Sequence, residues 1–309
     1  METASQLGWW GVALAVLGGA LRVSTPFLFV SLGECLTEKS GRVNLGLEGT
    51  LVMGAMIGFG GSYLSGSAFL GVLAASLVGA AFGALHGWLC GRPRVNDIAV
   101  GIALMLLGVG LAFFLGKPLI KPSAPQLPSL PLGNFSDVPA VRAALQVNVL
   151  FLAGALLAFA LRIMLKRTRW GLVLRTVGES ADAARAMGYS VGGVRFWATT
   201  AGGALAGIGG AFLSLYYPGS WNEGLSSGQG LMAVALVIFA KWDPVRCLWA
   251  SLLFGGASAL GPALQSVGIT SGYYLFGAAP YVLTLIIMIA TSSATRTLAG
   301  QPAELAAAR

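Results

Sequence analysis

Charged residues are scarce in this sequence: they make up 10% of 309 residues, whereas hydrophobic residues make up 56%. A soluble globular chain is about one quarter charged, so this chain has too few charges to cover a soluble protein of its size. The same composition excludes intrinsic disorder, which requires low hydrophobicity and high charge. Its 45 glycines have no period of three, which excludes collagen. An all-α, polytopic helical membrane protein remains, in which glycines let helices pack closely.

Residues for catalysis and metal binding are also few. His86 is the only histidine and no CxxC pair occurs, so the sequence offers neither a metal site nor a nucleophile–base pair. No phosphate-binding loop of the form GxxxxGK[ST] is present, since Gly116-Lys117 is followed by Pro118. The chain is therefore expected to be neither an enzyme nor an ATPase, and to hold no cofactor. The cysteines are expected to be small core residues; they are Cys35, Cys90 and Cys247.

Apolar segments long enough to cross a membrane, about 20 residues each, recur along a single domain covering residues 1–309. We expect eight to ten transmembrane helices, because the first and seventh segments could be broken or re-entrant. The first segment is interrupted by Arg22 and Pro26. The predicted spans lie at about residues 9–32, 45–64, 69–90, 98–115, 149–165, 196–217, 231–240, 247–264 and 274–291, followed by a tail at 292–309.

The net charge of +8 predicts membrane orientation rather than nucleic-acid binding, because cytoplasmic loops of membrane proteins collect Lys and Arg. The loop at residues 166–195, between the fifth and sixth spans, carries the strongest basic cluster and is expected to be cytoplasmic. Alternation then places Arg92, Arg94, Lys241 and Arg246 inside as well. The Pro-rich segment at residues 117–146 falls outside, and the N-terminus is outside unless the first span is re-entrant. The basic cluster consists of Lys166, Arg167, Arg169, Arg175, Arg185 and Arg195.

Polar side chains next to glycines interrupt three apolar segments. Such groups at membrane depth usually face a cavity or a partner, and broken helices with polar ends form translocation sites in transporters. Asn44 and Glu48 are four residues apart and are expected to share one helix face. Asn96 and Asp97 could instead only cap a helix. The predicted substrate path consists of Asn44, Glu48, Asn96, Asp97, Asn222, Glu223 and Gln229.

The basic loop contains a run of strong helix formers, Ala181–Met187, between Gly178 and Gly188. The pattern predicts a short helix at the membrane face. It could be a simple interfacial helix or a docking helix for a soluble partner. In the sixth span, Gly203 and Gly207 are four apart, a spacing that predicts close helix–helix contact.

Several motifs together resemble a known family. They are Leu36–Gly49 (LTEKSGRVNLGLEG), Arg94–Ile98 (RVNDI), the loop segments Arg175–Glu179 and Ala183–Tyr189, Ala233–Phe239 (AVALVIF) and Trp242–Pro244. Over roughly residues 10–292, the sequence resembles permease subunits of bacterial ABC importers in the branched-chain amino acid/ribose permease group. It is most similar to the branch that takes up nucleosides and simple sugars. Gln229 departs from the family pattern, because relatives usually carry an arginine there.

The resemblance implies a multi-pass permease of the bacterial inner membrane that imports nucleosides, guanosine-like purines in particular, or simple sugars. It implies three partners: a second, paralogous permease, a substrate-binding lipoprotein, and an ATPase that binds ATP and Mg. The helix in the basic loop would be the coupling helix seated in a groove of the ATPase. The coupling residues implied are Gly178, Glu179, Asp182, Ala184, Arg185 and Gly188.

Two other functions compete with this interpretation. An ion-coupled secondary transporter of a small polar solute needs membrane-embedded carboxylates, for which Glu34, Glu48 and Asp97 are candidates. An intramembrane enzyme is disfavoured, because no carboxylate pair with a His or Cys occurs at catalytic spacing.

Overall fold

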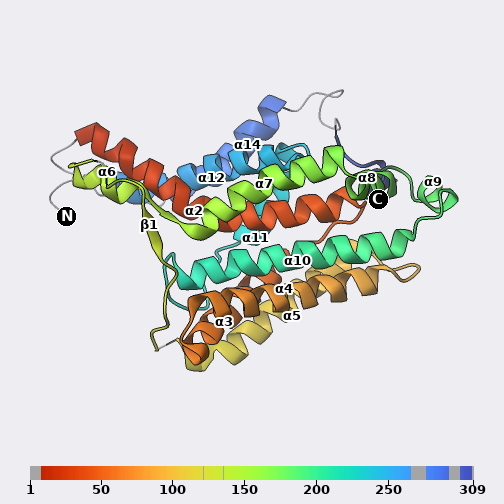
Figure 1. Ribbon diagram of the computed structural model, residues 1–309, viewed down its shortest axis with the longest axis horizontal. Coiled ribbons are helices and arrows are strands. Elements are labelled where there is room, and N and C mark those ends of the chain that lie inside the picture. Colours follow the sequence, from red (N-terminus) through yellow and green to blue (C-terminus); the bar gives the residue numbers. More distant parts are fainter. Residues whose placement is uncertain (1–7, 121, 135, 266–275, 292–299, 308–309) are drawn as a thin grey trace.

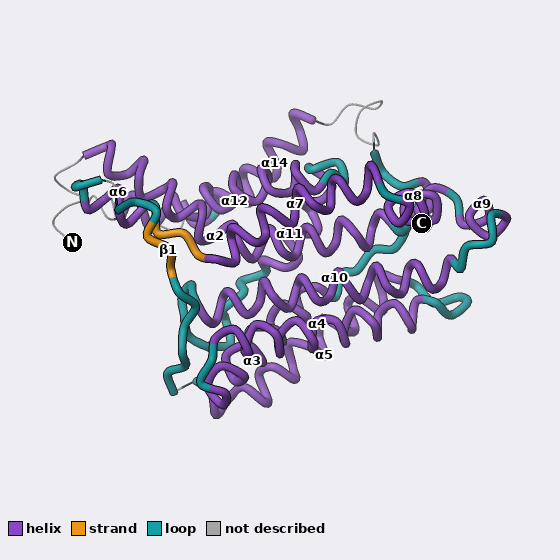
Figure 2. Tube along the Cα trace, viewed as in Figure 1, coloured by secondary structure: helices purple, strands orange, loops and turns teal. Residues whose placement is uncertain are grey.

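The computed structural model describes residues 8–120, 122–134, 136–265, 276–291 and 300–307 as an elongated bundle of helices (Figures 1 and 2). Two short strands, β1 (Ser129–Pro131) and β2 (Gln146–Asn148), pair antiparallel. The helices are α2 (Gly8–Lys39), α3 (Leu47–Ser65), α4 (Ala68–Cys90), α5 (Asp97–Gly116), the 3-10 turn η1 (Lys117–Leu119), α6 (Pro139–Ala144), α7 (Val149–Arg167), α8 (Arg169–Glu179), α9 (Ala181–Ala186), α10 (Val191–Leu215), α11 (Gln229–Phe239), α12 (Pro244–Gln265), α14 (Ala279–Thr291) and α15 (Ala303–Ala307).

Six helices among the described residues are long and apolar enough to cross a membrane, so the chain is an all-α, multi-pass membrane protein. These six are α2, α4, α5, α7, α10 and α12. Of the other predicted spans, α3 has 19 residues, α11 has 11 and α14 has 13. The start of the predicted ninth span and residues 292–299 of the predicted tail lie outside the described residues.

Helix α2 runs unbroken through Arg22 and Pro26 over 32 residues. The expectation that the first span could be broken or re-entrant is therefore wrong. A membrane helix tolerates proline where packed neighbouring helices compensate the backbone, and α2 packs against α10, α11 and α12. Arg22 is half-buried, and its guanidinium donates to the Ala143 carbonyl in α6 at 2.6 Å.

Helices α2 and α10 form the centre of the bundle, with α3, α4 and α5 on one side and α7, α12 and α14 on the other (Figure 1). Glycine makes the α10–α4 contact close. A Cβ on Gly203 would lie 2.9 Å from the Gly83 Cα, and a Cβ on Gly207 would lie 2.9 Å from the Ala75 carbonyl carbon. Such distances leave no room for a side chain, so the close contact predicted for this span is confirmed.

The basic loops and the Pro-rich segment lie at opposite ends of the bundle. The end that carries α8 and α9, here called the α9 end, also carries the C-terminal helix α15 (Figure 1). The Lys39 ammonium donates to the Gly300 carbonyl at 3.0 Å there, and Lys166 lies 3.6 Å from Asp243. The opposite end carries α6 and the Pro-rich segment with β1. The basic segments predicted to share one side therefore do lie at one end.

Candidate functional site

A buried carboxylate joins two helix ends inside the bundle. Glu48, in the first turn of α3, accepts hydrogen bonds from the Ser226 hydroxyl at 2.6 Å, the Gly228 N–H at 3.2 Å and the Gly230 N–H at 2.6 Å. These donors belong to the N-terminus of α11, where unpaired N–H groups and the helix dipole favour a negative charge. Glu48 therefore fixes the start of α11 within the bundle. We call this contact the Glu48 junction.

The backbones of α3 and α11 also pack closely at the Glu48 junction. A Cβ on Gly230 would lie 2.6 Å from the Glu48 Cα. Gly228 precedes α11 in the left-handed region, at φ 80°, which glycine adopts without strain. The glycines that flank Gln229 thus permit both the turn and the contact.

Asn44 does not share a helix face with Glu48, so that expectation is wrong. Helix α3 begins only at Leu47, because a turn separates it from α2. The Asn44 amide oxygen accepts from the Gly46 N–H at 2.9 Å, and the Asn44 N–H donates to the Glu34 carboxylate at 2.8 Å. Asn44 is buried and stabilises this turn.

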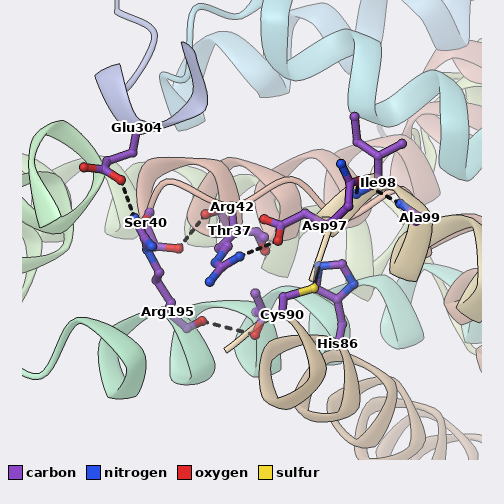
Figure 3. A network of polar contacts seen from close by, with 12 residues as sticks. Thr37, Ser40, Arg42, His86, Cys90, Asp97, Ile98, Ala99, Arg195 and Glu304 are labelled. Atoms are coloured by element: carbon purple, nitrogen blue, oxygen red, sulfur yellow. Dashed lines mark hydrogen bonds and ion pairs between the residues drawn. The ribbon is translucent and has the colours of Figure 1, made fainter. Parts of the chain in front are cut away.

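Asn96 and Asp97 lie at the α9 end of the bundle. Asn96 caps α5 by accepting from the Ile98 and Ala99 N–H groups at 2.9 and 3.0 Å, as the alternative interpretation predicted. Asp97 pairs with Arg42 from the turn after α2 (Figure 3). Asn96, Asp97 and Arg42 all line a cavity of about 780 Å³, which we call the polar cavity. Its other walls include Leu45, Val234, Ile238, Arg94, Arg195, Gln301 and Glu304.

The C-terminal helix connects the polar cavity to α9. The Glu304 carboxylate accepts from the Ala181 N–H, the first residue of α9, at 2.8 Å and from the Arg195 guanidinium at 3.0 Å. Arg195 in α10 also donates to the Ser40 carbonyl at 3.0 Å (Figure 3). Burial opposes ionisation of Glu304, but these hydrogen bonds and the charge of Arg195 outweigh it and lower its pKa.

Sequence reasoning missed this network of Arg42, Arg195 and Glu304. One available signal was Pro302 followed by a run of Ala, Glu and Leu, since proline favours the start of a helix. Nothing in the sequence pairs Glu304 with Arg195, because the two are separated by 109 residues.

Asn222, Glu223 and Gln229 lie on and after the segment that joins α10 to α11. Asn222 and Glu223 are exposed, and the Asn222 side chain accepts from the Gly224 N–H at 3.2 Å. The side-chain oxygen of Gln229 is buried and has no hydrogen-bond partner among the described residues. The predicted path residues therefore occupy three places: the Glu48 junction with this segment, the Asn44 turn and the polar cavity.

The predicted coupling element differs from its expected form at its start. Gly178 does not break the helix: α8 continues to Glu179, and Gly178 packs against the Lys39 backbone. Ser180 separates α8 from α9 and caps α9 by accepting from the Ala183 N–H at 3.2 Å. Gly188 ends the element as expected, in the left-handed region at φ 84°. Helix α9 forms the tip of the molecule at this end (Figure 1).

The predicted coupling residues differ in exposure: Ala184 is buried, whereas Glu179, Asp182 and Arg185 are exposed. Ala184 is fully buried and packs with Val177 and Val191, so it stabilises the α9 fold and does not belong to a docking surface. The outward side carries Glu179, with Asp182 and Arg185 paired at 2.6 Å. It also carries two exposed apolar residues, Met187 and Tyr189, at 56% and 42% exposure.

The sequence matches the family described as branched-chain amino acid transport system / permease component over residues 15–292. The chain belongs to this family. The match includes the Glu48 junction and α9, whereas α15, which supplies Glu304 to the polar cavity, lies beyond the matched residues. The family places the chain among transport subunits rather than enzymes.

Individual relatives carry transporter names. The chain is 35% identical to TsgC13 of Haloferax volcanii, provisionally named a glucose ABC transporter permease, over 83% of this chain and 80% of that protein. It is 30% identical to the guanosine ABC transporter permease NupQ of Bacillus subtilis, over 88% and 90%. It is 29% identical to the nucleoside ABC transporter permease NupC of Lactococcus lactis, also over 88% and 90%.

All three of these organisms have a second, less similar permease. Haloferax volcanii also has TsgB13, at 26% identity, Bacillus subtilis has NupP, at 25%, and Lactococcus lactis has NupB, at 23%. Each organism therefore has two unlike permeases of this kind, and this permease is more similar to NupQ and NupC than to NupP and NupB.

Proposed function

We propose that this chain is one of two unlike permease subunits of an ATP-driven ABC importer for nucleosides or simple sugars, in the cytoplasmic membrane of a bacterium. The family match over residues 15–292, with relatives named for guanosine, nucleosides and glucose, carries the proposal. The partners are a paralogous permease, an ATPase that binds ATP and Mg, and a substrate-binding lipoprotein on the outer side. The presence of two unlike relatives in each of three organisms supports the second permease.

In this proposal the α9 end faces the cytoplasm, because it collects the basic loops. The six helices long enough to cross, together with α3 and α14, give eight spans. Helix α11 is a half-helix that starts inside the membrane at the Glu48 junction and ends at the cytoplasmic side. Half-helices of this kind place helix termini beside a translocation path.

In this proposal, conformational changes of the ATPase displace α9. The outward side of α9 docks on the ATPase, and Glu304 carries the displacement from the Ala181 N–H to Arg195. Because Arg195 and Glu304 both line the polar cavity, a shift of α9 changes the cavity. The polar cavity is then the cytoplasmic exit of the path, and Asn96 and Asp97 lie on its wall.

Competition of labelled guanosine uptake tests the substrate class. Vesicles that contain the complete transporter are challenged with unlabelled purine nucleosides, pyrimidine nucleosides, ribose and glucose. Inhibition by nucleosides at concentrations where the sugars have no effect supports nucleoside import, and the reverse order supports sugar import. Uptake that none of them inhibits contradicts both.

A further inference from the structure

A second hollow lies on the outer surface of the bundle, separate from the polar cavity. It has a volume of about 550 Å³, within the range of about 300–1,000 Å³ that is usual for small-molecule sites. We call it the lateral groove. Its lining comes from α2, α7, α8 and α10, and Figure 1 shows α2 between α7 and α10. Its lining is almost entirely apolar and includes Leu36, Met164, Leu174, Val194 and Ala201.

The deep part of the lateral groove lies within the predicted sixth span. Along α10 the groove extends from Ser190, just before the helix, to Ala201. Eleven residues of helix correspond to about 16 Å. Because the basic loop includes residues 190–195, only the stretch from about residue 196 to Ala201, about 9 Å long, lies within the hydrocarbon. The groove therefore begins at the cytoplasmic interface and enters the cytoplasmic leaflet.

The mouth of the lateral groove carries side chains suited to a phospholipid headgroup. Trp170 and Trp197 line the groove and are 80% and 69% exposed; tryptophan is enriched at the membrane interface. Arg167 lies three residues after Met164 on α7, and Arg169 lies four before Val173 on α8, so each shares a helix face with a groove residue.

Arg167 and Arg169 are also free to bind an anion. Both are exposed, and neither forms an ion pair with an acidic side chain of the described residues, whereas nearby Lys166 pairs with Asp243. Basic clusters between membrane helices on the cytoplasmic side attract anionic headgroups.

From these contacts we infer that the lateral groove binds one anionic phospholipid of the cytoplasmic leaflet. An acyl chain lies along Leu36, Met164 and Ala201, and the phosphate pairs with Arg167 and Arg169. The lipid bridges α7, α8 and α10 directly behind α9, because Val194 packs both against the groove and against the buried alanines of α9. This site does not depend on which solute is transported.

Quenching of tryptophan fluorescence by brominated lipids tests the site. The complete transporter is reconstituted in vesicles that contain brominated phosphatidylglycerol or brominated phosphatidylcholine at equal fractions. We expect stronger quenching by phosphatidylglycerol, with a preference of about tenfold in apparent affinity. Arg167→Gln/Arg169→Gln should reduce that preference towards one. Trp170→Phe/Trp197→Phe should remove the phosphatidylglycerol-specific part of the quenching.

Arg246→Gln is the matched control, because Arg246 is exposed at the same end of the bundle but does not line the groove. It should keep the full preference, and equal thermal midpoints verify folding of every variant. Equal quenching by both lipids in the wild type overturns the proposal, as does equal loss of preference in the control. If the Trp170→Phe/Trp197→Phe variant shows the same quenching as wild type, another protein covers the groove. That result also overturns the proposal.

Discussion

Replacing Glu48 removes the acceptor that fixes the start of α11. In Glu48→Ala, the Gly228 and Gly230 N–H groups lose their partner, whereas the Ser226 hydroxyl can rotate to another acceptor. The Gly230 N–H is buried, so leaving it unpaired costs about 1–3 kcal/mol. The Gly228 N–H is half-buried and costs less, so the variant should be destabilised by about 2–4 kcal/mol. Glu48→Gln keeps one carbonyl oxygen, so it leaves about one donor unpaired and should lose about 1–3 kcal/mol.

Thermal unfolding of the purified transporter and initial uptake rates measure these effects. We expect the unfolding midpoint and the uptake rate to fall in the order wild type, Glu48→Gln, Glu48→Ala. Asp137→Ala is the control, since Asp137 is exposed at the opposite end and its one ion pair among the described residues is with Arg142, at 3.3 Å. If Glu48→Ala unfolds at the same temperature as wild type, the junction does not hold α11 in place and the reasoning is refuted.

Four further substitutions test the packing and the coupling element. Gly207→Leu should lower the yield of assembled complex, because a side chain there would overlap the α4 backbone; unchanged yield in size-exclusion chromatography contradicts this. Ala184→Trp should reduce folded protein, whereas Ala186→Trp, on the exposed side of α9, should reach the membrane but lose substrate-stimulated ATP hydrolysis. The pKa of Glu304 is lowered from its usual value of 4.5, so ionised Glu304 stabilises the α15–α9 contact fully at pH values above 4.5. The contact weakens as the pH falls through the lowered pKa and Glu304 is protonated. Glu304→Gln should abolish this pH dependence in hydrogen exchange of α9, and an unchanged profile contradicts it.

Much of the helical layout follows from local sequence. The apolar runs predicted α4 (Ala68–Cys90) and α7 (Val149–Arg167) to within a few residues, because helix formation in a membrane depends on continuous hydrophobicity. The spacing of Gly203 and Gly207 predicted a close contact, since small residues at that spacing are useful only against another backbone.

Features that depend on distant partners could not be predicted. Proline and arginine suggested a break in α2, but the helices packed around it support it through Pro26. Asn44 and Glu48 have helical spacing, yet Glu34 fixes Asn44 in a turn. Ala184 appeared available for docking, but the sequence does not show which side of a short helix faces its own protein.

The central claim is that ATP hydrolysis by a partner subunit drives import through this permease. The most direct measurement is uptake of labelled guanosine or glucose into vesicles that contain the permease pair and binding protein, with and without the ATPase, while ionophores collapse ion gradients. We predict uptake that requires the ATPase and ATP and persists without gradients. Uptake that needs no ATPase and stops when the gradients collapse would contradict this claim and indicate an ion-coupled transporter.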